Sequence, residues 1–415
     1  MFNALKLSNW RQFESIQIDF HPRLTVLTGQ NGAGKTTILN ILNRHFGWNI
    51  NYTSTPKADK RGVISYFSDI WRKLTDTLVG SQETGNENVG EIEYSKGGHA
   101  TLVVPRQVTQ EYSLTINNQQ DQPGLHIPSH RSVYRYQPVL QIPTKVVTAQ
   151  TASQNFSNEL ANRYAGGGGY LPNYRIKEFL ISLALFGPGN IVVAPNPDAW
   201  EMFEGFQKIL RILLPKDLGF RKIGVRMPEV VLETDSGEFS LDGVSGGVAS
   251  IIDISWLIYT YSRWQSDIVV TIDEPENHLH PAMQRSLLAD LLSAFPNVQF
   301  IIATHSPFIV TSSPESNVYV LRFNENKRVS SVFLEDVDKA GTSTEILRDV
   351  LGVTVTLPPW AEGRLENIID RYSETALNRE ELQKMSDELR GSGLSKRYVD
   401  SLTRLLSIKK RDDKT

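Results

Sequence analysis

The 415-residue sequence contains no cysteine. This absence excludes disulfide bonds, thiolate metal sites and cysteine nucleophiles, and it fits a protein of a reducing compartment. Positive charge is not in excess either, because the formal net charge is -3 at pH 7. Contact with nucleic acid would therefore need a local basic patch, which weakens any role in simply coating DNA.

Long apolar runs are also missing. The start, MFNALKLSNW, lacks a basic region followed by a long apolar run, and no stretch approaches the ~18 uninterrupted apolar residues of a membrane span. We therefore expect a cytoplasmic protein without a membrane partner. Apolar residues make up 40% of the sequence and charged residues 21%, which is typical of a globular protein with a large core.

The apolar pattern predicts strands and helices in alternation. Residues 4–7 and 15–20 alternate as in an antiparallel pair, and three apolar runs predict buried strands at 24–27, 268–272 and 298–303. Helical spacing predicts helices over 176–214 with breaks near 187–189 and 195–197, over 251–261, over 281–295 and beyond 361. The four consecutive glycines of 165–170 predict a loop.

The stretch GQNGAGKTT at 29–37 lies between a buried strand and a helix. Its spacing is that of a phosphate-binding loop, in which backbone N–H groups surround phosphates at the N-terminus of a helix. Lys35 would bridge the β and γ phosphates of a nucleotide, and the Thr36 hydroxyl would bind Mg²⁺. The candidate phosphate-binding residues are Gly29, Asn31, Gly32, Gly34, Lys35, Thr36 and Thr37.

Two acids follow the predicted strand 268–272. Asp273 and Glu274 emerge at the carboxyl edge of a buried strand, where open α/β sheets bind their ligands. We expect Asp273 to hold Mg²⁺ and Glu274 to act as general base on the attacking water. His305 follows the predicted strand 298–303 in the same way and would lie within reach of a γ-phosphate.

A serine and two glycines precede the apolar helix at 251–261. Ser245 is a good N-cap, and Gly246 and Gly247 allow backbone N–H groups to approach an anion at the positive end of that helix. By itself this triplet is a weak signal, because flexible helix entries often have the same composition. Its position between the loop at 29–37 and the acids at 273–274 makes it a candidate γ-phosphate contact.

Together the four stretches GQNGAGKTT, VSGGVAS, VVTIDEPENHLHP and IIATHSP resemble the Walker A, signature, Walker B with D-loop, and switch-histidine motifs of the ABC-type ATPases. The start LSNWRQF and the DEPENHLHP form resemble the SMC, RecF and OLD-like branch, which includes ATPase subunits of bacterial anti-phage systems such as the PtuA-like proteins. The resemblance covers about 1–50 and 240–310. Val244 and Trp10 depart from it, since Leu and Phe are commoner there.

This resemblance implies an α/β fold. It is a P-loop ATPase head with an N-terminal antiparallel β-subsheet, a mostly parallel core sheet flanked by helices, and a helical lobe that carries the signature. We expect the head over 1–355, with an insertion at about 48–125 and the helical lobe at about 150–265. Residues 356–415 would form a C-terminal helical extension.

The resemblance also implies ATP and Mg²⁺ as ligands, ATP hydrolysis, and a homodimer or higher homo-oligomer. One chain supplies only one copy of each motif. In the family, the serine and glycines that correspond to Ser245, Gly246 and Gly247 complete the γ-phosphate site of the opposite subunit. The implied active form is therefore a head-to-tail homodimer with two ATP molecules at its interface.

Three functions remain open at this stage. The first is a regulator that uses ATP to hold or release a separate effector protein, a nuclease or toxin, in anti-phage defence. The second is a DNA repair or maintenance ATPase of RecF or SMC type, with nucleic acid as partner. The third, a transporter ATPase, is disfavoured by the DEPENHLHP form and by the long interval between Thr36 and Ser245.

Two details are left undecided by the sequence. Either Gln137 or Gln141 could be the glutamine that ABC-type ATPases carry near the γ-phosphate. Arg131 could reach a phosphate, although we favour a surface salt bridge for it.

Overall fold

The computed structural model describes residues 1–58, 62–68, 85–106, 108–131, 133–142, 147–164, 166–335, 345–350, 358–373, 378–394 and 402. The chain forms two compact units, Met1–Ile346 and Leu347–Thr415. The boundary expected between 355 and 356 lies outside the described residues, so it stays a prediction.

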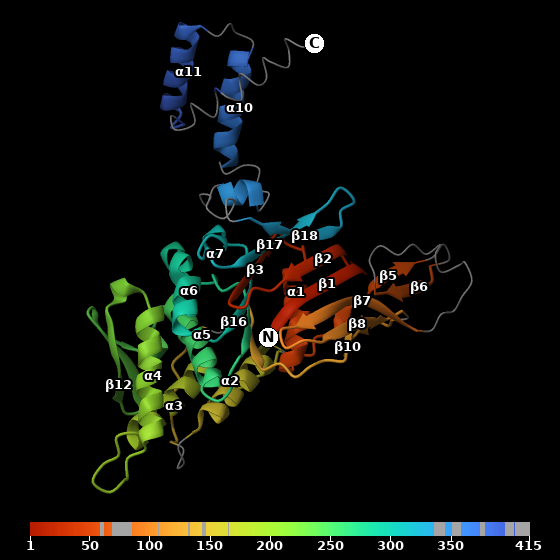
Figure 1. Ribbon diagram of the computed structural model, residues 1–415. Coiled ribbons are helices and arrows are strands. Elements are labelled where there is room, and N and C mark those ends of the chain that lie inside the picture. Colours follow the sequence, from red (N-terminus) through yellow and green to blue (C-terminus); the bar gives the residue numbers. More distant parts are fainter. Residues whose placement is uncertain are drawn as a thin grey trace. The chain divides into compact units, whose positions relative to one another are not determined.

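Within the described residues, eleven strands of the first unit form one sheet (Figure 1). In spatial order these strands are β10 (Thr115–Asn117), β8 (His99–Pro105), β7 (Asn86–Tyr94), β1 (Phe2–Trp10), β2 (Phe13–Asp19), β18 (Val329–Leu334), β17 (Asn317–Phe323), β3 (Leu24–Gly29), β16 (Gln299–Ala303), β15 (Val269–Asp273) and β11 (Gly124–Ile127).

One half of this sheet is parallel. Strands β17, β3, β16, β15 and β11 pair in parallel, each with its neighbour. Every residue of β3, β15 and β16 is buried, as expected for β-branched strands covered by helices on both faces. The predicted strands at 24–27, 268–272 and 298–303 and the mostly parallel core sheet are therefore confirmed.

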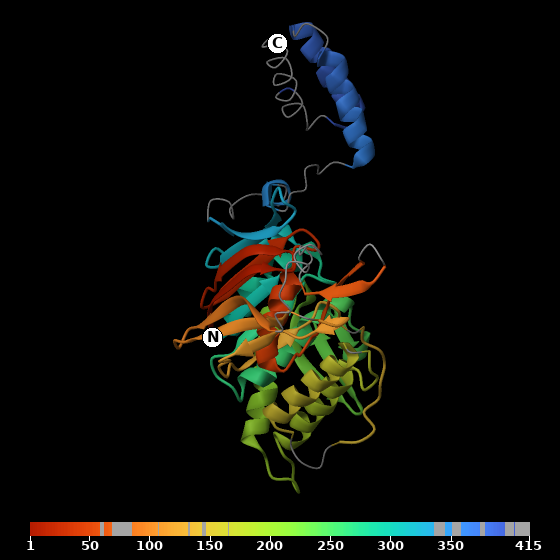
Figure 2. The ribbon, with the colours of Figure 1, turned by 90° about the vertical axis from the view of Figure 1, so that its right-hand side faces the viewer.

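The other half is antiparallel, except that β2 pairs with β18 in parallel. Strands β1 and β2 form the predicted N-terminal pair, and β1 also pairs with β7, β7 with β8, and β8 with β10. This differs from the insertion expected over 48–125, because β7, β8 and β10 continue the main sheet. Outside it, β4 (Tyr52–Thr53) pairs with β9 (Glu111–Tyr112), and β5 (Thr55–Ala58) pairs with β6 (Ile64–Phe67). Figures 1 and 2 show β5 and β6 standing away from the main sheet.

Helices cover the parallel half. Helix α1 (Lys35–Asn43) packs on β3, β15 and β16 through the buried side chains Ile38, Leu39, Ile41 and Leu42. Each such side chain contributes roughly 1.5–3 kcal/mol when fully buried. Helix α6 (Pro281–Ala294) follows β15, and α7 (Pro307–Val310) follows β16. Short turns of 3-10 helix lie at η1 (Arg44–Phe46) and η3 (Lys216–Leu218), and a π-helical turn lies at η5 (Ile346–Val350).

A lobe of helices and one small sheet lies beside the parallel half (Figure 1). Its helices are α2 (Ala149–Tyr164), α3 (Pro172–Phe186), α4 (Pro197–Leu213) and α5 (Gly246–Ser262). The predicted breaks near 187–189 and 195–197 are confirmed between α3 and α4. The small antiparallel sheet was not predicted; it consists of β12 (Phe220–Arg226), β13 (Glu229–Thr234) and β14 (Gly237–Ser240), and the turn η4 (Leu241–Gly243) connects it to α5.

The second unit contains α10 (Pro359–Ser373) and α11 (Arg379–Gly391), as the helical pattern beyond 361 predicts. The two helices bury a cluster of their own, which includes Leu365, Ile368, Ile369, Met385 and Leu389. None of the described helices in either unit is long and apolar enough to cross a membrane.

Candidate nucleotide-binding site

The loop between β3 and α1 needs glycine at two positions. Gly29 has φ 139°, and a Cβ there would lie 2.3 Å from the Leu321 carbonyl oxygen of β17. Gly34 has φ 96°, and a Cβ there would lie 2.5 Å from the Phe13 ring. Both conformations are unfavourable for other residues, so the close packing of this loop depends on glycine.

The N-terminus of α1 is open to an anion. Its cap is Gly34, which has no side chain to accept hydrogen bonds from the first-turn N–H groups of Lys35, Thr36 and Thr37. Asn31 and Gly32 are exposed at the tip of the loop. An uncapped helix N-terminus at the end of a buried strand fits the phosphates of a nucleotide.

Lys35 is 5% exposed and points back over the loop. Its Nζ donates to the carbonyl oxygens of Gly29 at 3.0 Å and Gln30 at 3.3 Å, and it lies 3.4 Å from His305 Nδ1. The structure thus brings together a buried ammonium group and the histidine that follows β16, although 270 residues separate them in the chain.

A hydroxyl and a carboxylate meet at the carboxyl end of β15. Thr36 Oγ1 donates to Asp273 Oδ2 at 2.9 Å. Mg²⁺ prefers oxygen ligands, and it usually takes one or two from the protein together with phosphate oxygens and water. Thr36 and Asp273 fit that requirement, and they are the residues that would hold the ion.

Glu274 lies between Asp273 and the turn that follows it. Its Oε2 accepts from Asn277 Nδ2 at 2.9 Å, and its Oε1 lies 3.8 Å from His305 Nε2. Its backbone has φ 47°, a left-handed conformation that is uncommon for glutamate. The turn therefore holds the carboxylate on the same side of the sheet edge as Lys35 and His305.

Glu276 is a residue of this site whose role the sequence did not reveal. Its Oε1 accepts hydrogen bonds from Thr304 Oγ1 at 2.7 Å, His305 N at 2.9 Å and Ser306 N at 3.1 Å. These bonds tie the turn after β15 to the turn after β16. The only local signal was a third acid close behind Asp273 and Glu274.

Replacing Glu276 by Ala should lower both stability and turnover. Three donors lose a charged acceptor, so we expect the free energy of unfolding to fall by about 2 kcal/mol. His305 would lose the constraint on its backbone, and Glu276→Gln should lie between the alanine variant and the original chain. Urea unfolding followed by tryptophan fluorescence checks this; a change below about 0.5 kcal/mol for Glu276→Ala would contradict it.

Burial shifts the protonation of the three groups that face the phosphate loop. It lowers the pKa of Lys35 from 10.5 to about 8, against the attraction of Asp273 and Glu274. It raises the pKa of Asp273 from 3.8 to about 6, which the hydrogen bond from Thr36 opposes. Burial and the nearby Lys35 charge also lower the pKa of His305, which favours the neutral imidazole.

These shifts predict that ATP binding with Mg²⁺ is tightest between about pH 6 and pH 8. As the pH falls through the raised pKa of Asp273, the carboxylate is protonated and attracts Mg²⁺ less. As the pH rises through the lowered pKa of Lys35, the ammonium charge is lost and affinity falls by up to about tenfold per pH unit. Titration with a fluorescent ATP analogue from pH 5 to pH 9 checks this, and Asp273→Asn should flatten the acid limb. A flat profile for the original chain would refute the assignment.

The signature residues lie apart from this cluster within one chain. Ser245 caps α5 by accepting from Val248 N at 3.4 Å, as predicted, so the helix begins at Gly246 rather than at 251. A Cβ at Gly247 would lie 2.9 Å from the His278 carbonyl oxygen, which places the turn against the segment after Glu274. In the described part of the chain, no hydrogen bond connects 245–247 to the phosphate loop.

The structure corrects the expectation for Arg131. It is 8% exposed rather than part of a surface salt bridge, and its Nη2 donates to the carbonyl oxygens of Glu274, Pro275 and Asn277 at 3.1 to 3.2 Å. Local sequence could not reveal this, because the acceptors are backbone atoms more than 140 residues away.

The two candidate glutamines follow β11 in the chain, and β11 pairs with β15, the strand that ends at Asp273. Gln137 Oε1 accepts from Leu171 N at 3.2 Å, and its own N–H donates to Asp242. Gln141 is exposed. Neither has a hydrogen bond to the phosphate loop among the described residues, so the assignment of this glutamine stays open.

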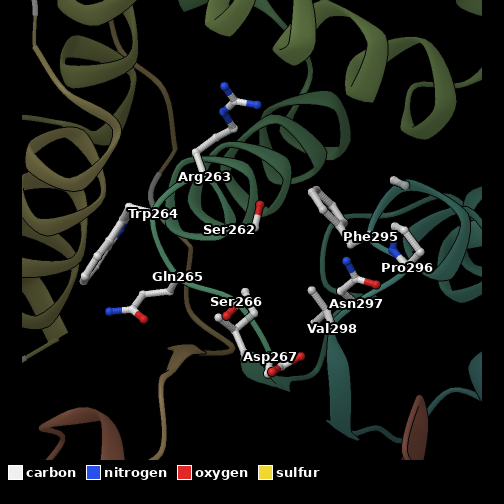
Figure 3. A pocket seen from close by; sticks show the side chains of 12 residues that line it. Ser262, Arg263, Trp264, Gln265, Ser266, Asp267, Phe295, Pro296, Asn297 and Val298 are labelled. Atoms are coloured by element: carbon white, nitrogen blue, oxygen red, sulfur yellow. The ribbon is translucent and has the colours of Figure 1, made fainter. Parts of the chain in front are cut away.

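A cavity of about 460 Å³ lies at the opposite end of the same strands. Figure 3 shows Ser262, Ser266 and Asp267 on one side of it and Phe295 and Val298 on the other. These residues precede β15 and β16, whereas Asp273 and His305 follow them. The cavity is therefore separate from the candidate nucleotide site.

Two family models and several curated proteins are similar to this chain. Residues 4–166 match the family described as "AAA domain", and residues 156–311 match "AAA domain, putative AbiEii toxin, Type IV TA system". The chain is 28% identical to the Septu protein PtuA of Bacillus mycoides (strain KBAB4), over 93% of this chain and 50% of that protein. It is 26% identical to the Septu protein PtuA of Bacillus thuringiensis, over 86% of each.

The chain thus spans about half the length of the first of these relatives. The SMC head domain from Thermotoga maritima is similar over 80% of this chain and 99% of its own, at 15% identity and a TM-score of 0.40. The motif series, the two family matches over 4–166 and 156–311, and the PtuA relatives support an ATPase of the SMC, RecF and OLD-like type.

Proposed function

We propose that the chain binds and hydrolyses ATP, dimerises head-to-tail around two ATP molecules, and thereby regulates a separate effector protein in bacterial anti-phage defence. The observation that carries the ATPase proposal is the meeting of Lys35, the Thr36–Asp273 pair and the Glu274–His305 pair at one edge of the sheet. These residues come from three loops that follow three adjacent parallel strands.

Each group has a role in hydrolysis. Lys35 and the first turn of α1 bind the β and γ phosphates, and Thr36 and Asp273 hold the Mg²⁺, which neutralises phosphate charge when bound. Glu274 accepts a proton from the attacking water, and Asn277 fixes the orientation of its carboxylate. The neutral His305 donates a hydrogen bond from its ring N–H to the γ-phosphate.

The position of the signature turn, Ser245, Gly246 and Gly247, supports dimerisation. Ser245 and Gly246 are exposed and lie apart from the phosphate loop of their own chain. An exposed N-cap at the start of a long helix is suited to an anion that arrives from outside. In a head-to-tail dimer, that anion is the γ-phosphate bound by the opposite chain.

The defence role is supported by the PtuA relatives, which match most of this chain. The motif resemblance implies the same group of defence ATPases, and the separate effector, a nuclease or toxin, is inferred from that analogy. A RecF-like or SMC-like role with nucleic acid is the alternative outcome of the partner experiment below.

ATP turnover at increasing protein concentration tests the dimer. If two chains build each site, turnover per chain should rise with concentration and level off when the dimer is saturated. Constant turnover per chain over a range of about 100-fold would support hydrolysis by single chains and contradict the dimer.

The partner is tested by purification of tagged Glu274→Gln protein from its native cells with ATP present. A companion protein in stoichiometric amount supports the regulator and identifies its effector. Recovery of nucleic acid alone favours the repair function. If neither a protein nor nucleic acid is recovered, that result contradicts a stable complex between the chain and an effector.

A further inference from the structure

We propose that Lys177 and Asp242 form a buried ion pair that positions the signature turn and so acts on the ATP of the opposite chain, an inference that rests on the proposed head-to-tail dimer. Lys177 belongs to α3, and Asp242 belongs to η4, three residues before Ser245. Both lie outside the motifs that carry the ATPase assignment.

Lys177 has no exposed surface. Its side chain is 0% exposed, and that of Asp242 is 4% exposed. The Nζ atom lies 2.5 Å from Asp242 Oδ2 and 3.2 Å from Glu229 Oε2 at the start of β13. A lysine is almost never fully buried unless it is paired, because the unpaired charge would lose its hydration.

The Asp242 carboxylate receives hydrogen bonds from two further directions. Asn173 Nδ2, one turn before Lys177 on α3, donates to Oδ1 at 2.5 Å. The backbone N–H of Gln137 donates to Oδ2 at 3.4 Å. Helix α3 and the segment at 137 are thereby joined at one carboxylate, and Lys177 connects β13 to it through Glu229. Because hydrogen bonds are directional, they restrain the position of Asp242 more closely than apolar packing would.

The restraint on Asp242 also limits the position of the signature turn, because only a short length of chain connects Asp242 to Ser245. Three residues span at most about 11 Å, so fixing Asp242 limits where Ser245 can lie. On its other side, Gly247 packs against the backbone of His278. The turn is held between these two contacts, and its serine hydroxyl and helix N-terminus stay exposed. Lys177 is thus a positioning residue, not one that touches nucleotide.

Lys177 has no bond to the Lys35, Asp273, Glu274 and His305 cluster among the described residues. Its loss should therefore leave ATP binding by a single chain within about twofold of the original value. Turnover, which needs the signature turn, should fall by at least about tenfold. Lys177→Met keeps the length and apolar stem of the side chain and removes only the charge.

A mixture of two inactive variants separates action on the opposite chain from action within the same chain. Lys35→Ala has a defective phosphate loop and an intact signature turn, whereas Lys177→Met has the reverse. A dimer of one of each contains one intact site. Random pairing makes half of the dimers mixed, so ATP turnover should recover to about one quarter of the original level.

Three controls define the result. Ser245→Arg mixed with Lys35→Ala should recover turnover, because the signature itself is disrupted. Glu274→Gln mixed with Lys35→Ala should not recover, because both changes affect the phosphate side. Arg175→Met removes a cation from α3 that pairs with Glu159 and Glu178, and it should leave turnover unchanged.

Turnover of Lys177→Met within about twofold of the original chain would overturn the inference. So would a defect that Lys35→Ala fails to rescue while the Ser245→Arg mixture recovers. If the Ser245→Arg mixture also fails, the head-to-tail dimer is wrong and the inference falls with it. If Lys177→Met does not fold, Lys177→Met combined with Asp242→Asn removes both buried charges, and the same mixture decides.

Discussion

Glu274→Gln should reduce ATP turnover by roughly 10²- to 10⁴-fold and leave ATP binding intact, because the amide cannot accept a proton from water. The structure allows this exchange without rearrangement. The Gln carbonyl can still accept from Asn277 Nδ2, and its NH₂ group can face His305 Nε2. With hydrolysis blocked, ATP should hold two chains together, so the variant should sediment as a dimer with ATP and as a monomer without it.

The matched control is Glu315→Gln, which makes the same chemical change at an exposed position after α7. It should retain the original turnover. Phosphate release and sedimentation velocity measure the two effects of Glu274→Gln separately. Turnover of Glu274→Gln within about threefold of the original chain would remove Glu274 from the role of general base.

Lys35→Ala should weaken ATP binding by about 10- to 100-fold, the loss expected for one hydrogen bond to a charged group. Among the described donors and acceptors, the ammonium group bonds only to the carbonyls of Gly29 and Gln30, besides its contact with His305. Burial of that charge is costly. Removal of the side chain should therefore leave the free energy of unfolding unchanged or raise it slightly while affinity falls.

Opposite effects on affinity and stability distinguish a binding lysine from a structural one. Lys208→Ala, at an exposed position of α4, is the matched control and should change neither quantity. Calorimetric titration with ATP and thermal unfolding without it give the two values. Unchanged ATP affinity in Lys35→Ala would refute its role at the phosphates.

The predictable parts of the fold were those with a strong local pattern. The runs at 268–272 and 298–303 are short, β-branched and bounded by polar residues, and both are buried parallel strands of the sheet. Strands β7 and β8 have a weaker pattern among many polar residues, so their place in the main sheet could not be derived. That place depends on pairing with β1, which lies more than 80 residues earlier in the chain.

The candidate site also has residues that local pattern predicts and residues that it does not. The phosphate loop, the acids Asp273 and Glu274, and His305 could be predicted from local pattern, because each is a polar group at the end of a predicted strand. Three contacts could be found only in the folded chain: Glu276 bonds to the His305 turn, Arg131 bonds to the turn after β15, and Lys177 pairs with Asp242. The physical reason is that these three are charged residues whose partners lie on other elements. Their burial, and hence their role, exists only when the fold brings those elements together.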